Sequence, residues 1–240
     1  MPRTFWFVQL QPTQLGYNPQ LPPLETDPRA LREAKAPYKD IPFEGQVEAR
    51  FLYGTLLSSD LLPFGHLPLR MVVLPIIPSA SGYELLTAEA AREQGYLKLA
   101  QWLERAESEW NRLRGSKSDR YTLIEWINHR RNLTLQSPTA RYRVLYPDVN
   151  RIMTACVVEL SPARLSGVVV DTTCYFCETD DELEAYYLCS LLNTPMIDER
   201  LGALRRKAQK THPHVHKKIF DVAVFPLYDA NDAKHRELAE

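Results

Sequence analysis

The sequence predicts an α+β protein, with a central mixed or antiparallel sheet, helices around it, and a helical pair around residues 84–135. Three observations predict this class. Short stretches rich in Val, Ile, Tyr and Phe, bounded by Pro or Gly, occur before residue 80 and again after residue 140. An amphipathic helical pattern lies between them. Three further helical patterns follow residue 178.

The composition is that of an ordinary globular protein. The 240 residues include 29 Lys and Arg against 30 Asp and Glu, with 45% hydrophobic and 25% charged residues. A formal charge of −1 argues against a highly basic chromatin-type protein but allows a local basic face. The sequence shows no signal-peptide core, no membrane-spanning apolar run, and too few cysteines for a disulfide scaffold. We therefore expect a cytoplasmic protein with no membrane partner.

The first 80 residues form a proline-rich part that contains β-structure. Residues 4–10 and 70–77 are predicted to be strands. Residues 11–28 contain five prolines among polar residues and are predicted to be an extended loop.

Residues 81–135 form a helical segment. A run of apolar residues spaced three or four apart predicts a helix from Tyr96 to Leu113, with charged residues on the other faces. We expect its apolar seam to pack against a neighbouring helix. A second, shorter helix is predicted over residues 121–133.

Residues 136–240 form an α/β core. Strand-like stretches cover residues 141–147, 151–160 and 167–178. A helix is predicted over 179–195, with Thr179 as its N-cap and acidic residues in its first turn, and another over 196–210. Residues 219–229 read as a final strand or an extended apolar segment, and a last helix begins near residue 229.

Most catalytic and metal sites lack their sequence signals. Cys174 and Cys177 form a single Cys-x-x-Cys without the second ligand pair that structural zinc needs, and on a strand they would point to opposite faces. His212, His214 and His216 share one strand face, but Pro213 and the following lysines disfavour a bound dication. The chain has no Gly-x-Ser-x-Gly, no Gly-x-Gly and no P-loop. We therefore expect no catalytic, cofactor-binding or metal-binding residues in this chain.

Two basic segments with polar and aromatic neighbours are the best candidates for a binding surface. Arg and Lys with Gln, Asn and His are the side chains that meet phosphates and base edges, although a solvated face is about as common for either segment alone. Together they predict a DNA-binding set: Arg130, Arg131, Gln136, Arg141, Arg143, Arg205, Arg206, Lys207, Lys210, His214, His216, Lys217 and Lys218.

The order of several segments is similar to that of a known family. A strand of the type Asp-Thr-Thr-x-Tyr at 171–175 precedes a helix that ends Leu191-Leu192-Asn193-Thr194, where the family usually has Leu-Asn-Ser. A basic His-Lys-Lys segment, the sequence Phe-Pro-Leu-Tyr-Asp at 225–229 and His235 follow. Over residues 43–240, and best after 120, the chain resembles the C-terminal target-recognition region, with TaqI-like specificity, of N6-adenine DNA methyltransferases of restriction–modification systems.

The resemblance implies a recognition module without its catalytic domain. The family's glycine-rich S-adenosylmethionine turn and its Asn/Asp-Pro-Pro-aromatic motif for the flipped adenine are missing, since the one Asn-Pro here, Asn18-Pro19, continues Gln-Leu. The expected partners are double-stranded DNA and a methyltransferase domain or subunit that binds S-adenosylmethionine, so this chain alone should not be an enzyme. The alternatives are a protein-interaction or scaffold domain that uses the seam from Tyr96 to Leu113, and a metal-dependent hydrolase built on the histidines.

Overall fold

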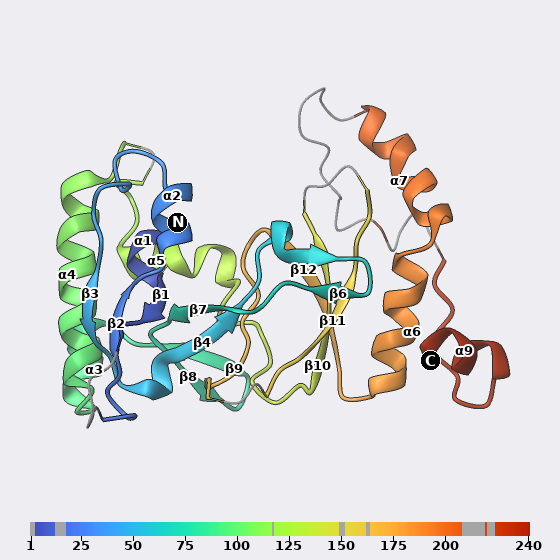
Figure 1. The fold of residues 1–240 in the computed structure, drawn as a ribbon, viewed down its shortest axis with the longest axis horizontal. Coiled ribbons are helices and arrows are strands. Elements are labelled where there is room, and N and C mark those ends of the chain that lie inside the picture. The colour runs from blue at the N-terminus through green and yellow to red at the C-terminus, as the bar shows by residue number, and fades with distance from the viewer. Residues whose placement is uncertain are drawn as a thin grey trace. The chain divides into compact units, whose positions relative to one another are not determined.

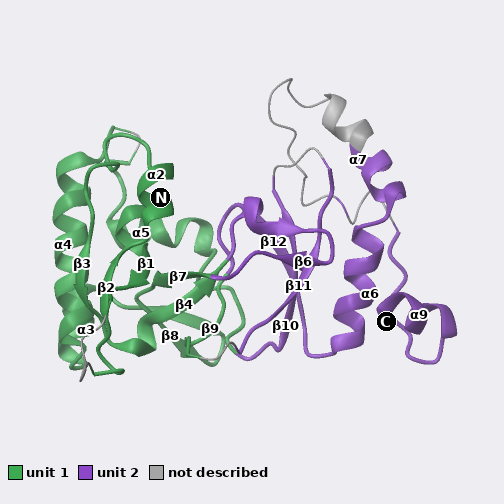
Figure 2. Cartoon of the chain, in the orientation of Figure 1, with its two compact units in different colours: residues 1–55, 70–138, 162–169 green, residues 56–69, 139–161, 170–240 purple. Residues whose placement is uncertain are grey.

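A computed structural model describes residues 3–12, 18–116, 118–148, 152–161, 164–207, 219 and 224–240, with side chains described only up to Leu201 in the helix that ends at Lys207. This part of the chain is α+β and divides into two compact units (Figure 2). Unit 1 comprises residues 1–55, 70–138 and 162–169, and unit 2 comprises residues 56–69, 139–161 and 170–240. The units differ from the three consecutive blocks expected from the sequence, because residues 56–69 belong to unit 2 and the chain then returns to unit 1.

Unit 1 contains a five-stranded antiparallel sheet in the order β3-β2-β1-β7-β4 (Figure 1). Its strands are β1 Phe7–Leu10, β2 Pro23–Thr26, β3 Glu44–Gln46, β4 Leu52–Thr55 and β7 Arg70–Val73. A separate hairpin joins β8 Ile76–Ser79 to β9 Gly82–Leu85. The helices are α1 Arg3–Trp6, α2 Pro28–Glu33, α3 Ala88–Glu93, α4 Leu97–Leu113 and α5 Leu123–Ile127, with short 3-10 turns η1 Ala49–Phe51 and η3 His129–Arg131.

Helix α4 confirms the amphipathic pattern, and its apolar seam is buried within unit 1. Leu99, Leu103, Ala106 and Trp110 are each at most 2% exposed. The indole of Trp102 on the same helix donates a hydrogen bond to the carbonyl of Phe5, next to strand β1, at 2.9 Å. These side chains of the seam therefore pack inside unit 1, and the interaction or scaffold role stays an untested alternative.

Other expectations for unit 1 need correction. The stretch 11–28, expected to be a loop, contains β2, whose Leu24 and Thr26 are buried against the sheet. The expected strand 70–77 is two strands, because the chain leaves the sheet at Leu74 and pairs as β8 from Ile76. The expected helix 121–133 ends at Ile127, because the side-chain oxygen of Asn128 accepts hydrogen bonds from the amides of Leu133 and Thr134 and turns the backbone out of the helix.

Unit 2 contains a three-stranded antiparallel sheet in the order β11-β10-β12. Its strands are β10 Tyr142–Pro147, β11 Cys156–Glu159 and β12 Cys174–Thr179. The 3-10 turn η2 Ser58–Asp60 and a short hairpin of β5 Leu61–Leu62 and β6 Gly65–His66 precede it in sequence. The helices are α6 Glu182–Leu192, α7 Pro195–Lys207 and α9 Ala233–Ala239.

Strand β10 is the centre of unit 2 and is buried along its whole length. Tyr142, Val144 and Tyr146 occupy one face, as period-2 alternation requires, and share a core with Ala185 and Leu192 of α6. This explains why the short, aromatic-rich sequence 142–147 forms a strand at the middle of the sheet, where both neighbours complete its backbone hydrogen bonds.

The predicted elements of unit 2 exist, with shorter bounds. The strand expected over 167–178 begins only at Cys174, and the one over 151–160 spans Cys156–Glu159. Asp181 rather than Thr179 is the N-cap of α6, accepting hydrogen bonds from the amides of Leu183 and Glu184. Residues 224–229 form neither helix nor strand, and the last helix is present as α9. No helix in the described ranges is long and apolar enough to cross a membrane.

Candidate nucleic-acid interface

Arg130 and Arg131 lie in an unusual stretch of backbone directly after α5. Their φ angles are +58° and +61°, in the left-handed region, which costs an L-residue about 1–2 kcal/mol each. Both side chains are exposed, and neither guanidinium has a hydrogen bond or ion pair within the described part of the chain. Two adjacent strained residues with solvent-facing cations are an outlier that points toward a function for this turn.

The turn is held firmly by its neighbours. The side-chain oxygen of Asn128 accepts hydrogen bonds from the amides of Leu133 and Thr134, at 3.1 and 3.2 Å. The β8–β9 hairpin closes on it from the other side, where the amide of Tyr83 donates to the carbonyl of Thr134 at 3.2 Å. The backbone that carries the two arginines is therefore fixed at both ends, which lowers the entropy cost of binding through them.

Partly exposed aromatic rings stand beside the arginine turn. Trp126 and His129 have ring centroids 6.0 Å apart, and Tyr121 packs against both. The guanidinium of Arg120 lies 4.9 Å from the centre of the Tyr121 ring. Cations interleaved with aromatic rings are typical of surfaces that bind nucleic-acid strands.

Gln136 is wrong as a DNA-binding residue. Its side chain is 0% exposed, and its amide nitrogen donates to the carbonyl of Asn132 at 2.8 Å. The side chain therefore stabilises the loop from inside and cannot reach a base edge.

The first predicted segment continues into unit 2, where it contains one exposed and one buried arginine. Arg141 precedes β10 and is exposed; its guanidinium lies over the ring of Tyr142, 5.3 Å from the centroid. Its backbone amide donates to the carboxylate of Asp180 at 3.0 Å. The exposed guanidinium of Arg141 is accessible to a phosphate. The nearby carboxylate of Asp180 would repel that phosphate at short range.

Arg143 is wrong as a DNA-binding residue because it is an interior ion-pair partner. Its side chain is 0% exposed, and two of its guanidinium nitrogens lie 2.9 and 2.8 Å from Oε1 of Glu178. Arg143 and Glu178 are direct cross-strand neighbours of β10 and β12, so the pairing register itself brings the two charges together.

The remaining predicted cations are only partly covered by the structure. Arg205, Arg206 and Lys207 lie in the last turn of α7, but their side chains are not among those described. Lys210, His214, His216, Lys217 and Lys218 lie outside the described residues.

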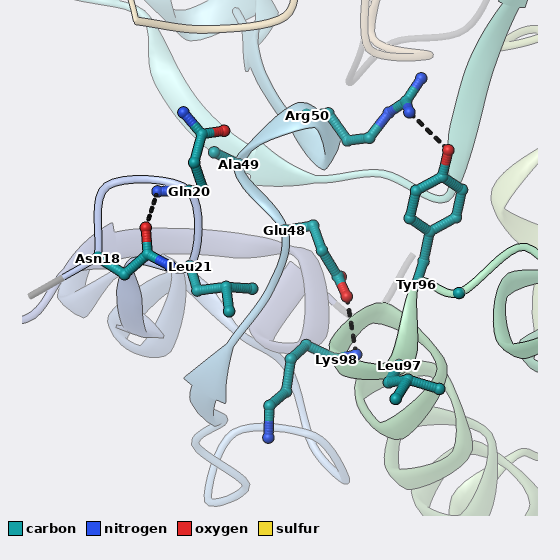
Figure 3. A pocket seen from close by; sticks show the side chains of 10 residues that line it. Asn18, Gln20, Leu21, Glu48, Ala49, Arg50, Tyr96, Leu97 and Lys98 are labelled. Atoms are coloured by element: carbon teal, nitrogen blue, oxygen red, sulfur yellow. Dashed lines mark hydrogen bonds between the residues drawn. The ribbon is translucent and has the colours of Figure 1, made fainter.

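Unit 1 also contains a pocket of about 440 Å³ that sequence reasoning missed (Figure 3). It lies between the turn at Asn18–Leu21, the turn η1 and the start of α4. The carboxylate of Glu48 accepts hydrogen bonds from the amides of Lys98 and Leu99, at 2.9 and 2.8 Å, and so caps α4 from outside the helix. The guanidinium of Arg50 donates to the hydroxyl of Tyr96 at 2.5 Å.

Two cationic side chains, those of Arg50 and Lys98, line this pocket. They stand 48 positions apart in sequence, so no local pattern could have paired them. None of the predicted DNA-binding residues lines this pocket.

No family model matches this chain, and neither does any curated protein.

The residues that carry the family resemblance have structural roles in unit 2. Asn193 follows the end of α6. Its side-chain oxygen accepts a hydrogen bond from the amide of Ala155, and its side-chain nitrogen donates one to the carbonyl of Ala155, both at 2.9 Å. His235 of α9 accepts the amide of Asp229 at 3.0 Å and lies 3.3 Å from the hydroxyl of Tyr187. These contacts hold α6, α9 and the loop before β11 together, and they would be needed whatever the unit binds.

The cysteines offer no reactive thiol at neutral pH. Burial raises the pKa of Cys156 and Cys174 to about 12, and that of Cys177 and Cys189 to about 11. Thiols of this kind stay protonated near pH 7, so they are poor nucleophiles and poor metal ligands.

Proposed function

We propose that this chain is a DNA-binding target-recognition module that acts with an N6-adenine methyltransferase domain or subunit of a restriction–modification system. The observation that carries the proposal is the arginine turn. Arg130 and Arg131 adopt left-handed backbone angles on an anchored loop, and their exposed guanidiniums have no protein partner in the described ranges. Two consecutive arginines on an anchored backbone are suited to two oxygens of a DNA backbone.

Three further features support a nucleic-acid ligand. Aromatic rings stand beside the turn, and the order of segments from residue 120 onward resembles the target-recognition region named above. The segment 201–220 carries six Lys and Arg and no acid, in a chain whose overall charge is −1.

The proposal assigns catalysis to the partner. We expect no methyl transfer and no S-adenosylmethionine binding by the purified chain, because the cofactor turn and the base-gripping motif are missing from its sequence. Transfer of a labelled methyl group to DNA by this chain alone would contradict this assignment.

The test measures the affinity for random duplex DNA at a series of salt concentrations, with fluorescence anisotropy as the readout. Each phosphate neutralised contributes about −0.9 to the slope of log affinity against log salt. Replacing Arg130 and Arg131 together with Gln should therefore flatten the slope by about two units and weaken binding to all sequences alike. Replacing Lys217 and Lys218 with Ala should have a similar effect if both contact phosphate.

The matched control removes the same charge elsewhere. Arg29 and Arg32 are exposed on α2 and outside the predicted set, so Arg29→Gln/Arg32→Gln lowers the net charge by the same amount. All variants must keep the wild-type melting curve. An equal loss of affinity in the control would show a nonspecific charge effect, and failure of the wild-type chain to bind duplex at low salt would refute the DNA-binding function.

A further inference from the structure

Unit 2 holds a second pocket, of about 260 Å³, between β12, α6 and the segment 224–229. Aromatic side chains form much of its lining, from Tyr187, Phe225 and Tyr228, and two carboxylates, of Glu178 and Glu184, complete it. No Lys, Arg or His is among the described residues that line it. None of the predicted DNA-binding residues lines it either, so this site is independent of the function proposed above.

The pocket walls are fixed without a ligand. The hydroxyl of Tyr187 on α6 donates to the carbonyl of Pro226 at 3.2 Å, and the rings of Tyr187 and Tyr228 pack with centroids 5.4 Å apart. His235 holds the far end of the segment through the amide of Asp229. The irregular segment 224–229 is thus seated on α6 at several points, which gives a largely preformed cavity.

Among the described residues, the two carboxylates give the pocket one uncompensated negative charge. Glu178 is paired with the buried guanidinium of Arg143, which lies behind it in the sheet. Glu184 accepts a hydrogen bond from the hydroxyl of Thr179 and has no cationic partner among the described residues. Both carboxylates act on Cys177, since burial first and then Glu178 and Glu184 raise the pKa of its thiol. The thiol therefore stays neutral and adds no charge of its own.

One polar group of the lining lacks a partner. The hydroxyl oxygen of Tyr228 is buried and has no hydrogen bond within the described part of the chain. A buried phenol of this kind needs a donor or an acceptor, and a ligand in the pocket could supply it.

We propose that this pocket binds an alkylammonium group, a primary ammonium carried on an apolar stem. The ammonium would pair with Glu184 and donate to the hydroxyl of Tyr228, while the aromatic faces favour a cation over a neutral or anionic group. Leu188 and Phe225 would cover the stem. A Lys side chain of a partner protein and a free diamine share this chemistry.

The experiment uses isothermal titration of the full chain with n-butylammonium, and with n-butanol and butyrate as neutral and anionic analogues. For a ligand of this size the expected dissociation constant is on the order of 1 mM. Glu184→Gln keeps an acceptor for Thr179 but removes the charge, and should weaken n-butylammonium at least about tenfold. Tyr228→Phe keeps the ring and should weaken it about threefold.

The control is Glu182→Gln, which removes an equal charge from the same helix at a position outside the lining, and should leave the affinity within about twofold. Melting curves must match the wild type. Binding of butanol or butyrate as tight as that of n-butylammonium would overturn the proposal, as would the absence of heat at about 10 mM, roughly ten times the expected constant.

Two further ligands distinguish the sources of the ammonium. A Lys-containing peptide that binds at least about tenfold tighter than a free diamine would identify the side chain of a protein partner as the ligand, because the rest of the peptide adds contacts around the pocket. Equal affinity of the diamine would identify a free amine.

Discussion

The ion pair between Arg143 and Glu178 should contribute to the stability of unit 2 and not to DNA binding. The two side chains differ in burial: that of Arg143 is 0% exposed and that of Glu178 is 25% exposed. Removing one partner leaves the other charge behind, so the cost depends on which charge remains.

The two single substitutions should therefore have unequal effects. Glu178→Gln removes the carboxylate that pairs with the fully buried guanidinium of Arg143, and should lower the free energy of unfolding by about 3–5 kcal/mol. Arg143→Met leaves a carboxylate that water can reach, and should cost about 1–3 kcal/mol. The double variant Arg143→Met/Glu178→Leu removes both charges and should lie within about 1 kcal/mol of wild type.

The assay is urea unfolding followed through the NMR signals of backbone amides in β10 and β12, which belong to unit 2. The four tryptophans, Trp6, Trp102, Trp110 and Trp126, all belong to unit 1, so their fluorescence would report on the wrong unit. Arg112→Met is the control: it breaks an exposed pair with Glu109, spaced three residues apart on α4, and should cost less than about 0.5 kcal/mol. If both single substitutions, at 143 and at 178, lower the free energy of unfolding as little as the control does, water reaches Arg143. Arg143 could then contact DNA, contrary to the interpretation given for it.

Three other perturbations test unit 1 and the thiols. Gly82→Ala should lower the free energy of unfolding of unit 1, measured by tryptophan fluorescence, by about 3 kcal/mol or more. At Gly82 φ is +137° and an added Cβ would lie 2.1 Å from the carbonyl oxygen of Thr134. The control Gly115→Ala, where an added Cβ meets open space, should change this free energy by less than about 0.5 kcal/mol. Glu48→Ala removes the cap of α4 and should cost about 1–2 kcal/mol in the same assay, whereas the exposed Glu93→Ala should be neutral. The free energy of unfolding should fall as pH rises from about 9 towards 11–12, because the folded state keeps the four thiols protonated with pKa values of about 11 to 12 while the unfolded thiols ionise near 9.0; a flat profile over this window would contradict their burial.

Local patterns predicted the strongly periodic elements correctly. Helix α4 follows from apolar residues three and four apart, and β10 follows from its aromatic and branched residues between Arg141 and Asp148. The sequence did not reveal β3, because its residues Glu44, Gly45 and Gln46 are all exposed and carry no apolar alternation. That strand exists because β2 offers it an edge, and the backbone of its residues, not their side chains, makes the pairing.

The binding residues were harder to predict than the fold, because burial of a polar side chain depends on tertiary contacts. In 128–136 one residue, Asn128, accepts two amides and diverts the helix that the sequence favoured. This diversion leaves Arg130 and Arg131 in solvent and turns Gln136 inward. Sequence reasoning placed all three on one surface, since it had no signal for a side chain that competes with the helix for backbone hydrogen bonds.

The two arginines around β10 show the same limit in a strand. Arg141 and Arg143 are two residues apart, so alternation places them on the same face, and a half-buried strand would expose both. In unit 2 that face is covered as well, and the register opposes Arg143 to Glu178 and Leu145 to Phe176 of β12. A charge on a strand that is buried on both faces must find a counter-charge across the strand, and the register supplies Glu178 opposite Arg143. Arg141 stands one residue before the strand begins, where water still reaches it, and this single step along the chain separates a cation that could meet phosphate from one that cannot.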